Sequence, residues 1–407
     1  MFIYTMADIH TGYYLIVFTV EGFQMASEKL NIIEQFKNLD ILKVDRRTFL
    51  KAVAALGATS FVSIYGNELA QALGEFPNTK VLWLHGAECT GCSESALNGH
   101  SPEFAEALSK LNISLVYHET LLAQQGIFVD GKLAGTSELN GEILLKELIA
   151  EGGYILVVEG AIGNGPSNTG KINVIGTHTF KHIFEDAAKS ANAIIALGTC
   201  ATYGGITVTD SDVKKYCDFQ GVNQTETSKG GMMKILGINK PVINLPGCPA
   251  HPDWFFLTVA AVLLGKIDVG NLDGILDRDG RPKVFYPPTH TLHENCPRRG
   301  FYDQGHLDTQ FAKGGCLWKI GCKAPYVHSD CALRKWNNGL SVCMQAGGPC
   351  IACVEPVFPN GSMPYYVERE SAGVLFGLNL GAVAGFAIAA AVVAAGVHAV
   401  RRVNKEK

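Results

Sequence analysis

Charged residues are scarce in this sequence. Asp, Glu, Lys and Arg make up 18% of its 407 residues, against about 25% in a typical soluble domain. The net charge of -4 leaves no basic surplus for a phosphate backbone, which excludes nucleic acid as the expected partner. Repeats of fixed period and long low-complexity tracts are absent too, so the chain is not a repeat protein. Hydrophobic residues make up 47% of the chain, and part of it is expected to meet lipid.

The C-terminal region contains a long stretch without charge. No Asp, Glu, Lys or Arg lies in residues 371–400, and about 20 apolar residues already span a bilayer as a helix. Arg401 and Arg402 open a basic tail, residues 401–407, and such residues mark the cytoplasmic side of a membrane. We therefore predict one transmembrane helix at 371–400 with a cytoplasmic C-terminus. A buried hydrophobic hairpin is the alternative.

Residues 1–72 have the features of an export signal preceded by an extension. Arg46 and Arg47 stand in "DRRTFLKAV", directly before an apolar run over residues 52–65. This order is similar to that of twin-arginine signals, although Asp45 stands where Ser or Thr is commoner. An ordinary amphipathic helix with two arginines is the alternative. Export together with a C-terminal anchor predicts a single-pass protein of the cell membrane whose body lies outside the cytoplasm.

Between residues 73 and 265, short apolar runs alternate with helix-like stretches. The runs are "KVLWLHG", "ISLVYHE", "YILVVEG", "AIIALGTC" and "PVINLPGC", and the helix-like stretches include "SPEFAEALSKL" and "NGEILLKELIAEG". This alternation predicts an α/β domain with a parallel sheet and helices on both faces. Ligands bind at the carboxyl edge of such sheets. Cys89, Cys92, Cys200 and Cys248 lie in turns that follow three of the runs, so their sulfurs are expected to converge on one site.

Residues 266–367 lack this alternation and are rich in glycine, proline and cysteine. A segment so poor in periodic apolar residues needs cross-links or metal centres to fold. Its candidate ligands are His293, Cys296, Cys316, Cys322, Cys331, Cys343, Cys350 and Cys353. With the four sulfurs of the preceding domain they make twelve ligands, enough for three four-ligand sites, whereas Cys217 is expected to be an ordinary free thiol. Thiolate sites hold zinc or iron–sulfur clusters, and disulfides are the further alternative.

Seven stretches resemble the small subunit of membrane-bound nickel–iron hydrogenases, over about residues 76–367. They are "ECTGCSES", "VVEGAIGNG", "GTCATYGG", "PGCPAHPDW", "HTLHENCPRRGFYD", "CLWKIGCKAP" and "GGPCIACVEP". The resemblance is closest to the cytochrome b-linked subunits that feed methanophenazine. It implies a flavodoxin-like doubly wound sheet, followed by an irregular iron–sulfur domain, and three iron–sulfur clusters in all.

The resemblance also implies a ligand set for each cluster. It assigns a proximal four-iron cluster to Cys89, Cys92, Cys200 and Cys248, and a distal four-iron cluster to His293, Cys296, Cys316 and Cys322. An imidazole ligand makes a cluster less negative and raises its potential, which suits the exit of an electron relay. The medial cluster is expected on Cys331, Cys343, Cys350 and Cys353. Many relatives have proline in place of Cys343 and a three-iron cluster; cysteine predicts a four-iron cluster here, with three iron atoms as the alternative.

In this family the nickel–iron site lies on a separate large subunit that splits H2. This chain would carry the electrons away, and holds no nickel site itself. The expected receiver is a membrane cytochrome b, which passes electrons to methanophenazine or to a quinone, and heterodimers that join into a higher oligomer are a further option. Two other classes stay open: an iron–sulfur subunit of another respiratory complex, such as NADH dehydrogenase, and a secreted, anchored protein stapled by disulfides.

Overall fold

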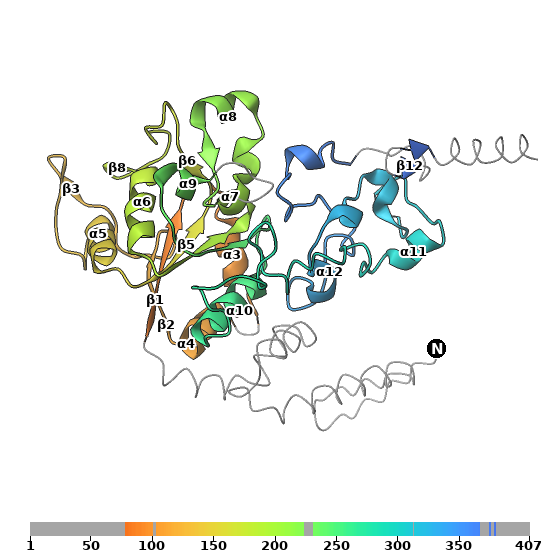
Figure 1. Cartoon of the computed structure of the whole chain (residues 1–407), viewed down its shortest axis with the longest axis horizontal. Coiled ribbons are helices and arrows are strands. Elements are labelled where there is room, and N and C mark those ends of the chain that lie inside the picture. The colour runs from red at the N-terminus through yellow and green to blue at the C-terminus, as the bar shows by residue number, and fades with distance from the viewer. Residues whose placement is uncertain are drawn as a thin grey trace, which may run out of the picture. The chain divides into compact units, whose positions relative to one another are not determined.

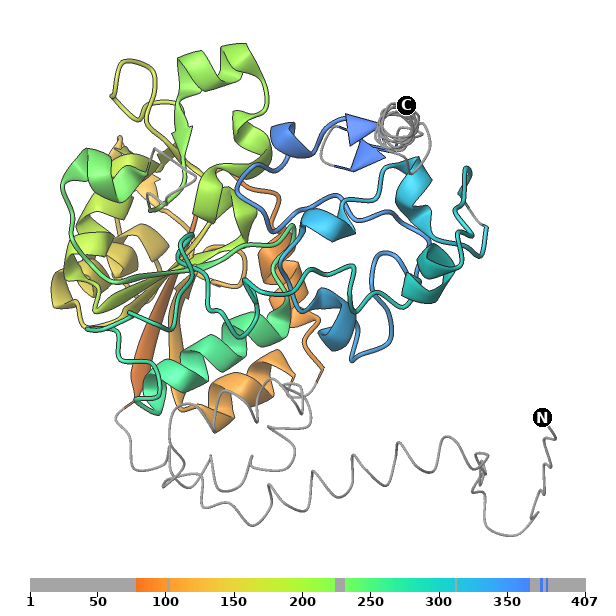
Figure 2. The same cartoon turned by 45° about the vertical axis from the view of Figure 1, so that its right-hand side comes forward.

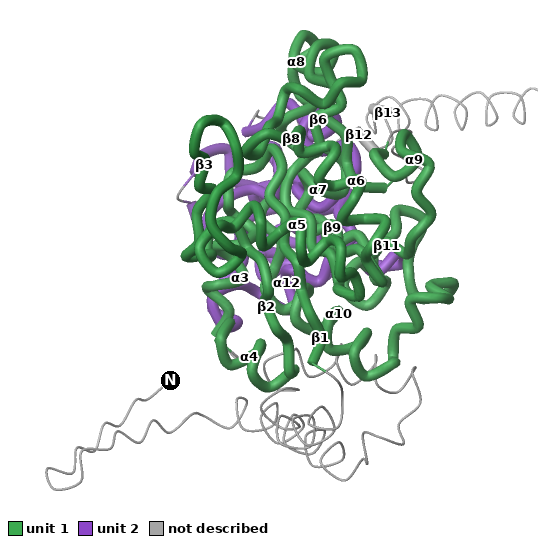
Figure 3. The backbone as a smooth tube through the Cα atoms, turned by 90° about the vertical axis from the view of Figure 1, so that its left-hand side faces the viewer, with its two compact units in different colours: residues 1–286 green, residues 287–407 purple. Residues whose placement is uncertain are grey.

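The computed structural model describes residues 78–100, 103–223, 231–311, 313–366, 374–375 and 378–379. The chain divides after Tyr286 into two compact units (Figure 3). The expected twin-arginine signal, with Arg46 and Arg47, lies outside the described residues, as do the basic tail and most of the expected membrane segment.

The first unit is built on a five-stranded parallel sheet. Its strands are β1 (Thr79–His85), β2 (Ile113–His118), β5 (Ile155–Glu159), β9 (Ala193–Leu197) and β11 (Val242–Leu245). Their order is β11-β9-β5-β1-β2, so the chain winds outward from β1 in both directions, as in flavodoxin-like sheets. Each strand coincides with one of the five apolar runs, which confirms the predicted α/β domain.

Helices cover both faces of this sheet (Figure 1). One face carries α5 (Gly141–Glu151) and α6 (Phe180–Ser190), and the other carries α3 (Gly91–Leu97), α4 (Phe104–Lys110) and α10 (Pro252–Leu263). Figure 2 shows α10 lying alongside α4, and the rings of Phe256 and Phe104 are 5.9 Å apart there. The two predicted helical stretches are therefore confirmed as α4 and α5.

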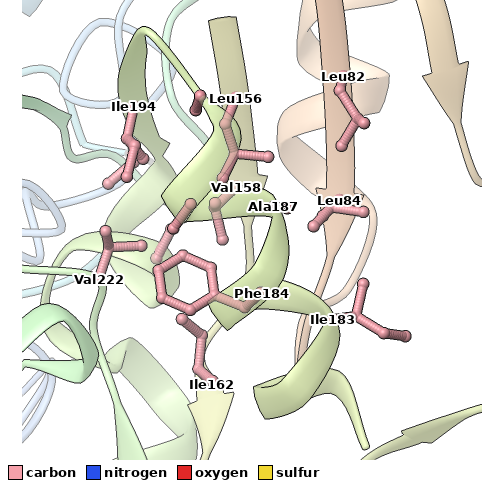
Figure 4. Close-up of a cluster of buried hydrophobic side chains, with 14 of the residues drawn as sticks. Leu82, Leu84, Leu156, Val158, Ile162, Ile183, Phe184, Ala187, Ile194 and Val222 are labelled. Carbon is pink, nitrogen blue, oxygen red and sulfur yellow. The ribbon is translucent and has the colours of Figure 1, made fainter. Parts of the chain in front are cut away.

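A cluster of buried apolar side chains lies between the sheet and the helices α5 and α6 (Figure 4). Successive strand residues point to opposite faces, so Leu82 and Leu84 join this cluster whereas Trp83 packs on Phe255 of α10, at 5.1 Å between rings. Phe184 of α6 is fully buried in the cluster. Burial of each such side chain contributes about 1.5–3 kcal/mol. The cluster contains residues from all five strands, so it stabilises the whole sheet.

Polar side chains cap the N-terminal ends of α5 and α6. The Asn140 side chain accepts the N–H of Glu142 at 3.0 Å and so caps α5, and Thr179 accepts the N–H of His182 at 3.2 Å at the start of α6. Such caps satisfy donors that a helix leaves unpaired in its first turn.

Short elements complete the first unit. They are β3 (Phe128–Val129), β4 (Lys132–Leu133), β6 (Ile162–Gly163), β7 (Val174–Ile175), β8 (His178–Thr179), β10 (Phe219–Gln220), α7 (Gly198–Tyr203), the 3-10 helix η2 (Gly205–Val208), α8 (Ser211–Cys217) and α9 (Met232–Leu236).

Residues 266–286 belong to the first unit, although the change in sequence pattern placed the domain boundary after Gly265. The segment is attached to the edge strand β11 by polar contacts. Asn244 donates from its backbone to Gly280 O at 2.9 Å, and the Tyr286 hydroxyl donates to Pro246 O at 2.7 Å. Arg281 is buried and its Nε donates to Asp277 at 2.7 Å. Because these contacts are not periodic in the sequence, apolar patterning does not reveal them.

The second unit has little regular structure in its described residues. Its elements are α11 (Arg299–Asp303), α12 (Cys331–Arg334), three 3-10 helices, η3 (Leu317–Ile320), η4 (Ala324–Tyr326) and η5 (Asn360–Ser362), and the strands β12 (Val374–Leu375) and β13 (Leu378–Asn379). Buried apolar residues such as Leu317, Val327 and Val354 form a small interior. This irregular architecture agrees with the scarcity of apolar periodicity in the sequence.

The start of the expected transmembrane helix differs from the prediction. The strands β12 and β13 pair antiparallel within residues 371–400, so these four residues are not helical in this structure. Glycines at 373 and 377 lower the helix propensity of this stretch. Among the described residues we find no helix that is long and apolar enough to cross a membrane.

Candidate metal centres

Four thiols meet at the carboxyl edge of the sheet. Cys89 and Cys92 follow β1, Cys200 lies in α7 directly after β9, and Cys248 follows β11. Burial, and then the neighbouring Cys248, raises the pKa of Cys200 to about 12. Burial raises the pKa of Cys248 as well, and Cys89 adds to this effect. Burial and the Glu159 carboxylate, followed by Cys200 and Cys248, raise the pKa of Cys92. The parallel topology thus gathers these thiols from three separate turns.

Two glycines make room for these sulfurs. A Cβ at Gly198 would stand 2.4 Å from Cys92 Sγ, and a Cβ at Gly205 would stand 2.8 Å from Cys200 Sγ. Both glycines have positive φ, +84° and +58°, which side chains disfavour. The backbone of Ala250 approaches from another side and donates to Cys92 Sγ at 3.4 Å. Backbone atoms therefore pack closely around the sulfurs of Cys92 and Cys200.

The carboxylate of Glu159 holds the turn that carries Cys92. It is 1% exposed, and one oxygen accepts the backbone N–H groups of Cys92 at 2.9 Å and Ser93 at 3.1 Å. The other oxygen accepts the Ser93 hydroxyl at 2.6 Å and the Trp83 indole at 3.1 Å. These N–H groups belong to the first turn of α3, where a negative group is favoured. The sequence analysis did not identify Glu159 as part of the site. An acidic residue at the end of the buried run "YILVVEG" could have indicated it.

A buried histidine pair extends this polar network. His118 shares a hydrogen bond with Ser93 Oγ at 3.1 Å, and its ring lies 4.7 Å from that of His85. Burial and the nearby His85 lower the pKa of His118 to about 4, so its imidazole is neutral at neutral pH. Potential ligand atoms of His85, Glu88 and Glu159 lie within 4.8 Å of one another. Each oxygen of Glu159 already accepts two donors, which leaves this carboxylate little capacity for a metal ion.

The second unit contains His293, Cys296, Cys316 and Cys322, the candidate ligands of one site. Burial raises the pKa of Cys296 and of Cys316. The neighbouring Cys316 adds to the rise for Cys296, and Cys322 adds to the rise for Cys316. The His293 ring is 8% exposed, and its Nε2 is buried without a hydrogen-bond partner. Burial lowers the pKa of His293, with the Arg299 charge as the next cause. A buried imidazole nitrogen without a hydrogen-bond partner fits a metal ligand.

The remaining thiols form an adjoining set. Burial raises the pKa of Cys331, and Cys353 and Cys343 add to this effect. Cys350 behaves in the same way, with Cys322, Cys353 and Cys331 as its neighbours. The two sets touch, because the backbone N–H of Cys350 donates to Cys322 Sγ at 3.3 Å. The Ser329 hydroxyl lies 2.9 Å from Cys331 Sγ. Cys343 is exposed to solvent, whereas Cys331 and Cys350 are buried.

These groups fit iron–sulfur clusters better than disulfides or isolated thiols. All of the cysteines are described, and none forms a disulfide. Burying several protonated thiols side by side leaves weak donors and acceptors without strong partners, whereas iron displaces the protons and binds each sulfur. The twelfth cysteine, Cys217, ends α8 apart from the three sets.

Two family models match the chain. The model of the C-terminal part of the NiFe/NiFeSe hydrogenase small subunit matches residues 289–366, and the model "NADH ubiquinone oxidoreductase, 20 Kd subunit" matches residues 89–262. The second match accounts for the respiratory alternative, and the first distinguishes the hydrogenases from it.

Individual relatives agree with these models. The chain is 58% identical to the F420 non-reducing hydrogenase I small subunit of Methanosarcina mazei over 385 residues, which cover 94% of this chain and 99% of the relative. The hydrogenase II small subunit of the same organism matches with the same identity and coverage. Among solved structures, the NiFeSe hydrogenase of Desulfomicrobium baculatum matches with a TM-score of 0.60 and 34% identity, over 72% of this chain and 100% of that one. These findings confirm the resemblance and the prediction of iron–sulfur cofactors. The chain therefore belongs to the small subunits of nickel–iron hydrogenases, which carry three iron–sulfur clusters and transfer electrons for the large subunit that holds the nickel–iron site.

Proposed function

We propose that this chain relays electrons from H2 oxidation in the large subunit to a membrane cytochrome b, and from there to methanophenazine or a quinone. The observation that carries the proposal is the gathering of buried thiols, at the sheet edge in the first unit and in a connected series in the second. Adjoining redox centres allow an electron to pass between them. The relatives with 58% identity are named as small subunits of F420 non-reducing hydrogenases. This name supports an electron acceptor other than F420.

The ligand sets follow the three thiol groups. In our proposal Cys89, Cys92, Cys200 and Cys248 bind the proximal cluster. His293, Cys296, Cys316 and Cys322 bind the distal cluster, and Cys331, Cys343, Cys350 and Cys353 bind the medial one. The electrostatic coupling among the thiols supports the proximal set. In the second unit the thiols couple in one continuous series, including Cys350 with Cys322, so there the division follows the resemblance in motifs. The chain's part in the chemistry is to supply these thiolates, shield them from water and fix their spacing.

Cys343 decides the composition of the medial cluster. Its sulfur lies close enough to Cys331 to raise the pKa of that thiol. Although the residue as a whole is exposed, partial burial of its thiol raises the pKa of Cys343 as well. A fourth thiolate can hold a fourth iron atom. We therefore propose a four-iron medial cluster, with the three-iron form as the outcome that would remove Cys343 from the ligand set.

The membrane part of the proposal rests on the sequence. Residues 371–400 contain no Asp, Glu, Lys or Arg, and a basic tail follows them. We propose that this segment anchors the chain in the cell membrane, with the C-terminus in the cytoplasm and the body exported by the signal around Arg46 and Arg47. Because the twin-arginine route carries folded proteins, it suits a chain that receives its clusters before export.

Comparison of the full chain with one that ends at Glu370 tests this function. Solubilised membranes with the full chain should yield the large subunit, this chain and a cytochrome b, and H2 should reduce the haem. The shortened chain should still support H2-dependent reduction of a soluble dye but should not reduce the haem. Equal haem reduction by both forms would contradict the role of the anchor, and a purified full complex without a cytochrome would contradict the proposed acceptor. As a control for export, replacing Arg46 and Arg47 by lysine should leave the complex in the cytoplasm.

A further inference from the structure

Arg298 links the loops of two candidate cluster sites. It lies between Cys296 and the helix α11 and is half-buried. Its backbone N–H donates to Cys296 Sγ at 3.4 Å. The main chain of Arg298 thus binds a thiol of the proposed distal set, which leaves its side chain available for other partners.

The guanidinium of Arg298 binds carbonyl groups from two other loops. Its Nε donates to Met344 O at 2.6 Å, and one terminal nitrogen donates to Gly315 O at 2.6 Å and to Lys313 O at 3.3 Å. Met344 directly follows Cys343 of the proposed medial set, and Gly315 directly precedes Cys316 of the distal set. The planar fork of an arginine can serve such separated acceptors at once, whereas a lysine ammonium is a compact point charge.

Arg298 forms an ion pair with a buried carboxylate. Asp308 is 4% exposed, and its Oδ2 lies 3.8 Å from the guanidinium, beyond hydrogen-bond distance. The carbonyl oxygens stabilise the cation but carry no net charge. Replacing Arg298 by a neutral side chain therefore removes one positive charge from the loop of Cys296 and leaves the buried Asp308 carboxylate without its ion-pair partner.

Close packing fixes this arrangement. A Cβ at Gly315 would stand 2.6 Å from Asp308 Oδ1 and 2.7 Å from His306 O. The backbone N–H of Asp308 donates to Cys316 O at 2.8 Å, and that of Cys316 donates to His306 O at 2.9 Å. The loop before Cys316 is therefore held on both sides, which presents Gly315 O to Arg298.

We propose that Arg298 is a positioning residue for electron transfer between the medial and distal clusters: it fixes the loop of Cys343 against that of Cys316, and its charge raises the reduction potential of the distal cluster. A cation favours the reduced state, because reduction adds negative charge to the cluster. This inference rests on the proposed ligand sets.

The test uses the complete heterodimer with Arg298→Gln, Arg298→Lys and, as a matched control, Arg281→Lys. Arg281 is also buried and paired with acids, but it lies in the first unit. Potentiometric titration followed by spin resonance measures each cluster separately, and iron content shows whether all clusters are present. These readouts do not depend on the activity of the enzyme.

We expect Arg298→Gln to lower the distal potential while leaving the proximal one unchanged. At a fixed potential the ratio of reduced to oxidised distal cluster should fall at least about tenfold, which is the effect of one unit charge at an effective dielectric constant of about 20 and a separation of about 12 Å. Tenfold is about 59 mV for a one-electron couple. Arg298→Lys should keep the distal potential near that of the wild type but weaken the magnetic interaction between the medial and distal clusters, since the lysine cannot bridge the loops. Arg281→Lys should change neither.

An unchanged distal potential in Arg298→Gln with full iron content would overturn the proposal, as would equal potentials in the glutamine and lysine variants. If the glutamine variant loses its distal cluster, the lysine variant decides: a wild-type potential supports the charge, and selective loss of the distal cluster supports the positioning. Loss of every cluster in both variants, as from general unfolding, would overturn it. If the proposed ligand sets are wrong, the wild type itself will lack three separate cluster signals, and that result is independent of Arg298.

Discussion

Replacement of Glu159 by glutamine should destabilise the turn that carries Cys92. The carboxylate accepts four donors on two oxygens, the N–H groups of Cys92 and Ser93, the Ser93 hydroxyl and the Trp83 indole. Glutamine has nearly the same shape but only one acceptor oxygen, and its amide nitrogen is a donor. If the oxygen serves the backbone of α3, the amide then faces the Trp83 N–H. Ser93 can turn its hydroxyl, but the indole cannot become an acceptor.

The magnitude follows from these contacts. A buried donor left without an acceptor costs about 1–3 kcal/mol, and hydrogen bonds to a charged group lose roughly 1 kcal/mol more when the charge is removed. We therefore expect Glu159→Gln to lower the free energy of unfolding by about 3 kcal/mol. This is a large part of the roughly 5–15 kcal/mol that stabilises a folded protein.

Guanidinium unfolding of the anaerobic heterodimer, followed by iron–sulfur absorbance, measures the effect. With a slope of about 3–6 kcal/mol per molar guanidinium, the midpoint should fall by about 0.5–1 M. The matched control is Glu151→Gln, because Glu151 is 59% exposed and its partner is the surface residue Lys80. Exposed ion pairs contribute about 0–1 kcal/mol, so the control should unfold close to the wild type. Equal midpoints for Glu159→Gln and Glu151→Gln would refute the role of the four hydrogen bonds.

Three further substitutions test the cluster sites. Gly198→Ala places a Cβ 2.4 Å from Cys92 Sγ at a φ of +84°; it should abolish the proximal cluster signal while the signals of the second unit persist, and a normal proximal signal would contradict the need for space there. Tyr286→Phe removes the 2.7 Å bond to Pro246 O and should destabilise the protein by about 1–2 kcal/mol in thermal unfolding; an unchanged Tm would show that residues 266–286 are held by other contacts. Cys343→Pro should create a three-iron spin resonance signal that the oxidised wild type lacks, whereas a strong three-iron signal in the intact wild type would exclude Cys343 as a ligand.

The sequence predicts the sheet well because each strand is a short, buried apolar run between helices. It also predicts which thiols meet in the first unit, since Cys92, Cys200 and Cys248 follow strands whose carboxyl ends share one edge. The topology of a parallel sheet supplies the convergence once the strands are recognised. The resemblance in motifs predicts the family, which the relatives confirm, whereas the grouping of ligands in the second unit stays a prediction.

The missed features depend on contacts that a residue pattern does not encode. Glu159 is a single acid at the end of an apolar run, and only the folded turn brings four donors to it. The side chain of Arg298 binds backbone carbonyl groups, which every residue type possesses, so its partners leave no mark in the sequence. Residues 266–286 are held to β11 through scattered polar groups, and apolar periodicity ends well before the unit does.

The two units set different conditions for cluster insertion during biosynthesis. The thiols at the sheet edge come from turns after β1, β9 and β11, so they meet only when the crossovers between these strands have folded. The candidate ligands of the second unit follow one another within a single irregular segment, and the Cys350 N–H bonded to Cys322 Sγ couples its two sites. With the proposed ligand sets, the proximal cluster therefore needs a folded domain before it can bind. The medial and distal clusters can instead order the polypeptide around them as they bind, and binding of one favours binding of the other.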